Sequence, residues 1–155
     1  MPLTIIEYEP RYFEDFRQMN LEWLEFYGLL EAHDMEMLND PEGVILDAGG
    51  AIFLAALDGA VVGSAALVPM HDTEEGYYEL AKMYVAPACR GKGISKLLIE
   101  KCLDKAREIG AGKIILYSNS QLQTAISLYT RYGFQHVPVT DSPFETADIK
   151  MELQL

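Results

Sequence analysis

The sequence predicts a single domain of the α+β class, in which helices pack on a β-sheet. The chain has 155 residues, of which 50% are hydrophobic, and this is enough to bury one core. Segments with the two-residue alternation of strands are interspersed with segments whose apolar residues recur every three or four positions. Neither an internal repeat nor a long linker divides the chain, so we expect one domain over residues 1–155.

The first third of the chain predicts one strand and two helices. Residues 3–8 have the composition of a strand, and Pro10 favours the first turn of the helix that follows. The predicted buried face of this helix has spacings of three and four residues and consists of Phe13, Phe16, Met19, Trp23 and Phe26. A second helix is expected over about 31–39, before a turn at residues 40–43.

The middle of the chain predicts three strands. Residues 51–57 and 60–68 are apolar and are joined by Asp58-Gly59, a dipeptide typical of a tight β-hairpin. Residues 77–85 predict the third strand. With unbroken alternation, one face of this strand carries Glu79, Ala81, Met83 and Val85. The other face carries Tyr78, Leu80, Lys82 and Tyr84.

The remaining residues predict two helices and three extended segments. Residues 91–109 are strongly amphipathic and predict a long helix. Its expected buried face consists of Ile94, Leu97, Leu98, Cys102, Ala106 and Ile109. A strand is expected over 113–117, a helix over 121–132, and extended chain over 134–139 and 145–153.

Charge is distributed unevenly along the chain. The formal net charge is −12, which argues against a nucleic-acid partner because phosphate backbones attract clustered Lys and Arg. Residues 1–81 contain 17 acidic and only two basic residues, whereas residues 82–155 contain 10 basic and 7 acidic ones. This pattern is typical of an acidic surface that maintains solubility. It equally fits an anionic ligand bound by the second half and a cationic one attracted by the first.

Several classes of protein are not expected. Cys89 and Cys102 provide neither a disulfide framework nor a metal-binding spacing, and His33, His71 and His136 are isolated from one another, so we expect no metal. No apolar run reaches the ~20 residues that span a bilayer, so no membrane partner is expected. The first residues lack the features of a signal peptide, and a cytoplasmic location is the expectation.

An anion-binding turn is predicted where the strand over 77–85 leads into the long helix. Gly91 and Gly93 allow close backbone approach to a ligand, and the start of a helix carries about half a positive charge. Full positive charges are added by Arg90, Lys92 and Lys96. The order of residues matches neither a Walker loop nor a dinucleotide-binding fingerprint. The alternative is a basic helix start with ordinary turn glycines.

Three segments resemble motifs of the GNAT superfamily of N-acetyltransferases. Arg90-Gly91-Lys92-Gly93-Ile94-Ser95 resembles the loop that binds the pyrophosphate of acyl-CoA. Residues 83–87 resemble the lead-in from the preceding strand, and residues 128–134 resemble the family's LYxxxGF segment. The order of predicted elements also fits the family, so the resemblance extends over essentially the whole chain.

This resemblance implies a fold and a cosubstrate. The implied fold has a mixed, mostly antiparallel central sheet of about seven strands and about four helices, with the acyl-CoA loop between the fourth strand and the third helix. The implied acyl donor is acetyl-CoA. Its pantetheine arm would bind the backbone of Met83, Tyr84 and Val85. Its pyrophosphate would bind Arg90, Gly91, Lys92, Gly93, Ile94, Ser95 and Lys96.

The resemblance also implies catalytic roles. Tyr129 matches a tyrosine that protonates the departing thiolate, and Glu79 stands where some members carry a general base. Asn119 takes over a pantetheine contact, because Leu122 occupies the position of the usual asparagine. A structural tyrosine in the core and a solvated glutamate are the alternatives for the two catalytic residues.

The function implied is direct transfer of acetyl from acetyl-CoA to a primary amine of a small molecule, peptide or protein, in a ternary complex. A cationic amine is the expected acceptor, because the acidic N-terminal region would rim its pocket with Trp23, Tyr27, Glu22, Glu31 and Asp34. The alternatives are a non-catalytic acyl-CoA-binding sensor or regulatory module, and a phosphate-binding protein unrelated to CoA. A monomer or a homodimer is expected.

Overall fold

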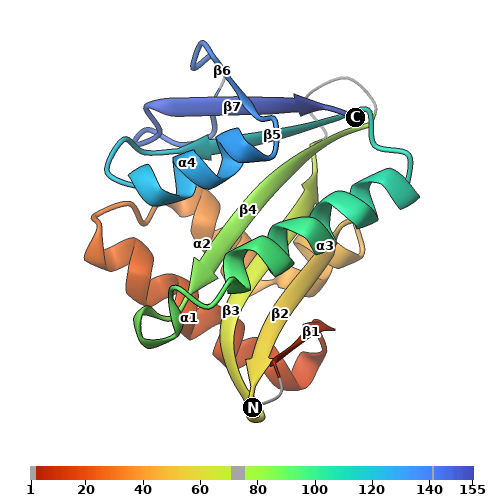
Figure 1. Ribbon diagram of the computed structural model, residues 1–155, viewed down its shortest axis with the longest axis vertical. Helices are drawn as coiled ribbons and strands as arrows, with labels where there is room; N and C mark the ends of the chain where they lie inside the picture. The colour runs from red at the N-terminus through yellow and green to blue at the C-terminus, as the bar shows by residue number, and fades with distance from the viewer. Residues whose placement is uncertain (1–2, 71–75, 141) are drawn as a thin grey trace.

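A single seven-stranded sheet organises the molecule, with helices on both of its faces (Figure 1). The computed structural model describes residues 3–70, 76–140 and 142–155, so His71 lies outside the described residues. The sheet has the order β1-β2-β3-β4-β5-β7-β6. Its strands are β1 (Leu3–Glu7), β2 (Ala51–Leu57), β3 (Ala60–Pro69), β4 (Tyr77–Val85), β5 (Lys113–Ser118), β6 (Gln135–Val137) and β7 (Ile149–Gln154).

Four α-helices and three short helical turns connect the strands. The α-helices are α1 (Phe13–Phe26), α2 (Ala32–Asn39), α3 (Ile94–Glu108) and α4 (Gln123–Arg131). The turns are Pro10–Tyr12, Glu42–Leu46 and Pro87–Cys89. The predicted α+β class, the number of strands and the number of α-helices are therefore confirmed. Among the described residues, no helix is long and apolar enough to cross a membrane.

The sheet separates two hydrophobic cores. On the face covered by α3 and α4, the core includes Leu80, Leu98, Cys102, Ile114 and Tyr129. On the face covered by α1 and α2, it includes Phe16, Leu24, Met37, Leu54 and Ala81. Because both faces are covered, the central strands are apolar on both sides.

Strand β4 contains a bulge that sequence alternation did not predict. Between the pairs Ala66↔Ala81 and Ser64↔Tyr84, two residues of β4 oppose one of β3, and Lys82 has a φ of 54°. The extra residue reverses the face on which the later side chains of β4 lie. The expectation that Met83 and Val85 share a face with Glu79 is therefore wrong: both pack in or against the α3 core.

The sheet opens between β4 and β5. These strands form its one parallel pairing among the described residues, and it extends over only Tyr77↔Lys113, Tyr78↔Ile114 and Glu79↔Ile115. Beyond Glu79 the two strands diverge, as Figure 1 shows. Backbone groups on the facing edges of the diverging strands are thus left without a strand partner, and a gap opens in the middle of the sheet.

Local details confirm some predictions and correct others. The hairpin at Asp58-Gly59 is confirmed, with φ values of 52° and 83° at its two central residues. Helix α3 begins at Ile94 and not at residue 91, because Gly93 adopts a left-handed φ of 78° that ends the turn. The helical segment Glu42–Leu46 begins within the turn expected at residues 40–43.

The buried faces of two helices differ from the predicted ones. Helix α1 buries Phe16 as predicted, but Phe26 is 79% exposed, and Asn20 and Leu24 are buried in addition. In α3, Leu97 is 40% exposed while Ile99 and Leu103 are buried. In α1, a hydrogen bond from Asn20 to Ser64 of β3 favours burial of Asn20 over that of a larger apolar side chain.

Candidate active site

A large cleft of about 760 Å³ occupies the gap between β4 and β5 on the α3–α4 side. Its walls are the diverging part of β4, the loop before α3, the end of β5 and the helix α4. Of the residues predicted to bind the donor, those lining it are Met83, Tyr84, Val85, Arg90, Gly91, Gly93, Ile94, Ser95 and Lys96. Lys92 and Asn119 do not line it.

The loop before α3 has the properties of an anion site. Gly91 and Gly93 have φ values of 82° and 78°, and a Cβ added at either would meet nothing within 4 Å. The first turn of α3 has no acidic residue and no side-chain cap, so its N–H groups remain available. Lys96 adds a positive charge at the positive end of the helix dipole, an arrangement that an anion would stabilise.

Arg90 lies at the junction of this loop with β4. Its Nε donates a hydrogen bond to the carbonyl oxygen of Val85 at 3.2 Å. The other guanidinium nitrogens have no hydrogen bond to the described residues and are available to a phosphate. The Val85 carbonyl, by contrast, is already satisfied.

Tyr129 lies in the wall of the large cleft. It is 7% exposed and packs against Phe134, with ring centroids 5.9 Å apart. Burial raises the pKa of Tyr129, so the phenol stays protonated at neutral pH. The side chain thus belongs to the core and also lines the cleft.

A small cavity of about 80 Å³ lies on the other side of the gap, facing α1 and α2. It shares six wall residues with the large cleft, namely Trp23, Ala81, Lys82, Tyr117, Ser118 and Leu122. The cleft and the cavity therefore meet where β4 and β5 separate. A molecule in one can reach a molecule in the other through the sheet.

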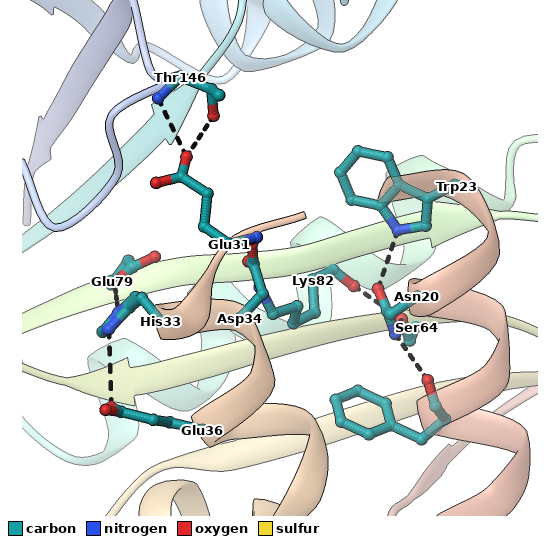
Figure 2. A network of polar contacts seen from close by, with 11 residues as sticks. Asn20, Trp23, Glu31, His33, Asp34, Glu36, Ser64, Glu79, Lys82 and Thr146 are labelled. Carbon is teal, nitrogen blue, oxygen red and sulfur yellow. Dashed lines mark hydrogen bonds and ion pairs between the residues drawn. The ribbon is translucent and has the colours of Figure 1, made fainter. Parts of the chain in front are cut away.

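Glu79 lines the small cavity and is 5% exposed, so it is not the solvated residue of the alternative interpretation. Its Oε1 lies 4.0 Å from Nε2 of His33, whose Nδ1 lies 4.0 Å from Oε2 of Glu36 (Figure 2). The adjacent Glu79 carboxylate raises the pKa of His33. Since Glu36 is exposed, the three groups connect the cavity to solvent.

A buried ion pair forms another part of the cavity wall. The Lys82 ammonium donates to Oδ1 of Asp34, and both side chains are less than 5% exposed. Oδ2 of Asp34 accepts from the backbone N–H of Glu31 at 2.9 Å. Sequence reasoning placed Lys82 on the face opposite Glu79, and only the bulge brings them to one cavity.

A chain of hydrogen bonds fixes the bulge (Figure 2). Ser64 Oγ donates to the carbonyl oxygen of Lys82 at 2.7 Å and accepts from Asn20 Nδ2 at 3.2 Å. Asn20 Oδ1 in turn accepts from Trp23 Nε1 at 2.9 Å. The Trp23 ring stacks on Tyr84 with an interplanar angle of 7°. These contacts hold α1 against the point where β4 turns away from β5.

The segment of residues 144–147, before β7, forms one wall of the small cavity. Both carboxylate oxygens of Glu31 accept hydrogen bonds from it: Oε1 from the N–H of Glu145 at 2.7 Å, and Oε2 from the N–H of Thr146 at 3.0 Å and from its hydroxyl. Asn119 Nδ2 donates to the carbonyl oxygen of Thr146 at 2.8 Å. Asn119 thus braces the cavity, and its predicted contact with pantetheine stays a prediction.

These contacts define which acidic residues remain available to an acceptor. Glu22 lines neither the cleft nor the cavity, and the oxygens of Glu31 and Asp34 are engaged within the protein. Of the two aromatic residues expected to rim the acceptor pocket, Trp23 lines both the cavity and the cleft, whereas Tyr27 lines only the cleft. Glu79 is the remaining carboxylate among the described wall residues of the cavity.

The sheet thus splits between β4 and β5, and a large cleft and an anion-binding turn lie at the split. The chain belongs to the GNAT family of acetyltransferases, since the profile described as "Acetyltransferase (GNAT) family" matches residues 14–134. The resemblance of the three motifs is thereby confirmed.

Individual known proteins are also similar to this chain. YjgM of Escherichia coli K12, named an uncharacterized N-acetyltransferase, is 38% identical over 89 residues, covering 57% of this chain and 53% of that protein. The chain spans about half the length of the curated relatives it matches first. A GNAT-family acetyltransferase from Staphylococcus aureus Mu50 has the same fold, with a TM-score of 0.89, 22% identity and 99% coverage of both chains.

A further structure is that of YncA from Salmonella typhimurium with its cofactor acetyl-CoA. It has a TM-score of 0.79 and 22% identity, and the match covers 99% of this chain and 94% of that one. At this level of identity the likeness demonstrates the fold.

Proposed function

We propose that this protein is an acetyl-CoA-dependent N-acetyltransferase that transfers acetyl directly to a primary amine in a ternary complex. The observation that carries the proposal is the meeting of the large cleft and the small cavity at the gap between β4 and β5. Tyr129 lies on the cleft side and Glu79 on the cavity side. A donor and an acceptor can therefore approach each other from opposite faces of the sheet.

The residues of the large cleft fit acetyl-CoA. The open space at Gly91 and Gly93, the free first turn of α3 and the charges of Arg90 and Lys96 suit a pyrophosphate. Edge groups of β4 at residues 83–85 suit the amides of a pantetheine arm, which would lie as an added strand. Acetyl-CoA, when bound, supplies the activated acetyl thioester. The acetyl-CoA in the YncA structure supports this assignment.

Glu79 is the proposed general base. An aliphatic ammonium has a pKa of ~10.4 and must lose a proton before it can act as a nucleophile. The Glu79 carboxylate lines the cavity where the amine would lie. His33 and Glu36 continue from Glu79 to the surface, so the proton has a route to solvent.

Tyr129 is the proposed general acid. It lines the cleft, its pKa is raised by burial, and it is therefore protonated when the thiolate of CoA departs. The backbone N–H of Val85 is the proposed donor to the oxyanion that forms at the thioester carbon.

The decisive experiment measures thiol release when the protein is mixed with acetyl-CoA and a panel of small amines and peptides. Amine-dependent release supports the proposal. Calorimetric binding of acetyl-CoA without turnover of any amine would instead indicate a binding or sensor module. Absence of binding would indicate a phosphate site unrelated to CoA, and free pantetheine serves as the control that lacks the pyrophosphate.

A further inference from the structure

The wall of the small cavity includes the ammonium group of Lys82, which has no role in the proposed transfer. Lys82 has a side chain only 4% exposed, and it stands on the bulge with a left-handed φ of 54°. Both features are costly, because a buried charge loses its hydration and a residue other than glycine is strained at this φ. A glycine or an asparagine would form the same bulge at lower cost. The fold alone does not explain a lysine here.

The Lys82 ammonium has unused donors. It carries three N–H groups, and among the described residues one of them is bonded, to Asp34. Its Nζ lies 5.7 Å from the centroid of the Phe144 ring, which also lines the cavity. The remaining donors are therefore available to a ligand that enters the cavity.

The other charged groups of the cavity wall are carboxylates, so Lys82 is the group there that can bind an anion. Asp34 is engaged by Lys82 through one oxygen and by the Glu31 N–H through the other. Glu79 faces His33. The cavity thus offers one carboxylate that can take a proton from an amine and one ammonium that can bind a negative group.

The volume of the small cavity restricts the choice of ligand further. The cavity measures about 80 Å³, roughly half of the ~150 Å³ that holds a benzene ring. An amine and an anionic group that both bind here are therefore separated by only a few bonds. A single ammonium with two free donors matches the two oxygens of a carboxylate, whereas a phosphate dianion needs more donors.

We propose that the acceptor is a small amino acid, whose carboxylate is bound by Lys82 while Glu79 takes the proton of its amino group. This inference rests on the proposed N-acetyltransferase function and names the acceptor class of the same site. A zwitterion adds no net charge to the cavity. Lys82 is thus a specificity-determining residue that discriminates amino acids from plain amines and from polyamines.

The test compares kcat/KM for matched acceptors. Alanine carries the carboxylate, ethylamine lacks it, and alaninamide replaces it with a neutral amide of similar size. The wild-type protein should prefer alanine over ethylamine by about 10- to 100-fold, the range of a hydrogen bond to a charged group. Glycine and β-alanine vary the separation of the two groups, and spermidine represents a polycationic acceptor.

Two variants separate the role of Lys82 from a structural one. Lys82→Met with Asp34→Asn removes both charges of the pair together, so that no carboxylate is left buried without a partner. This double variant should reduce the alanine-to-ethylamine ratio of kcat/KM to near one. Asp34→Asn alone keeps the cation, and the preference should persist. Circular dichroism and thermal melts identify a variant that has failed to fold.

The outcomes distinguish this inference from the function on which it rests. Turnover of ethylamine, alaninamide or spermidine at least as fast as alanine would overturn the amino-acid assignment and leave the acetyltransferase intact. An alanine preference that survives in the folded double variant would overturn the role of Lys82. Absence of turnover with every amine would overturn the proposed function and this inference with it.

Discussion

The large cleft and the small cavity meet at one gap in the sheet, yet they are constructed differently. The anion-binding end of the cleft comes from consecutive residues, 90–96, and uses backbone N–H groups, glycine conformations and a helix dipole. The cavity uses side chains from α1, α2, β3, β4 and the segment before β7. A local backbone site and a dispersed side-chain site thus face each other.

The difference has a physical consequence for each region. A site made of backbone groups depends on φ angles and tolerates change in most side chains around it. A site made of buried hydrogen bonds and ion pairs depends on every partner being present, because an unpaired buried group is costly. Variation of acceptor specificity is therefore expected to come from the cavity, while the donor end stays the same.

The substitution with the largest expected effect tests whether the proposed base in the cavity acts separately from acetyl-CoA binding in the cleft. Glu79→Gln should lower kcat by about 100- to 10,000-fold, because an amide cannot take the amine's proton. The affinity for acetyl-CoA should be kept, since Glu79 does not line the cleft. Steady-state rates and calorimetry measure the two quantities, with Glu14→Gln, at an exposed position of α1 outside the site, as the matched control. An unchanged kcat would remove Glu79 as the base.

Gly93→Glu tests the backbone site. A carboxylate near the pyrophosphate, at a φ of 78° that strains any side chain, should weaken acetyl-CoA binding by at least about 100-fold. Gly110→Glu is the control, because Gly110 has a φ of 77° with equally open space at the far end of α3. Equal losses in calorimetric affinity would point to general strain and would contradict the assigned loop.

Tyr129→Phe tests the acid on the cleft side. Removal of the hydroxyl should lower kcat by about 10- to 1,000-fold while the ring continues to fill the core. The control is Tyr132→Phe, whose hydroxyl donates to Glu100 at 2.6 Å on the exposed side of the same region. If both variants keep the wild-type kcat, Tyr129 is only a structural residue.

Ser64→Ala tests the hydrogen bonds that fix the bulge. The loss of this fully buried hydroxyl should lower the free energy of unfolding by about 1–3 kcal/mol, because the Lys82 carbonyl loses its donor. The KM for the acceptor should rise with it, since Lys82 stands on the bulge. Urea unfolding supplies the comparison with exposed Ser127→Ala, and equal stabilities would contradict the role of Ser64.

His33→Gln gives the smallest effect and a defined pH dependence. The folded-state pKa of His33 is raised above its ordinary value of 6.5 by Glu79, so its charged form stabilises the fold. That contribution, under about 1 kcal/mol for a partly exposed pair, is complete below the unfolded pKa and is lost as pH rises through the folded one. Urea unfolding at about pH 5.5 and about pH 8.5 should show a wild-type advantage only at the lower value. An advantage that grows with pH would contradict the assigned ion pair.

The contrast between the two regions also explains which features the sequence could predict. The turn at residues 90–96 and the hairpin at Asp58-Gly59 are determined by neighbouring residues, so local patterns were sufficient for them. The seven-strand α+β fold followed from the resemblance of three such segments to one family.

The features that sequence analysis missed depend on contacts between distant segments. Lys82 and Asp34 are 48 positions apart, and no local pattern marks the bulge that brings Lys82 beside Glu79. The burial of Asn20 in place of a larger apolar residue depends on Ser64, which is 44 positions away. Local patterns indicate only a surface or loop position for His33, and its role follows from the position of Glu79 alone.

The hydrogen bonds of Glu31 have a consequence for the order in which the molecule forms. They join residues separated by 114 and 115 positions, whereas every wall residue of the large cleft lies at or before Arg131. Contacts of such long sequence separation form late in folding, because the loop they close costs the most entropy. During synthesis, the wall of the small cavity is therefore completed only after residues 144–146 have emerged, when all residues of the large cleft have already been made.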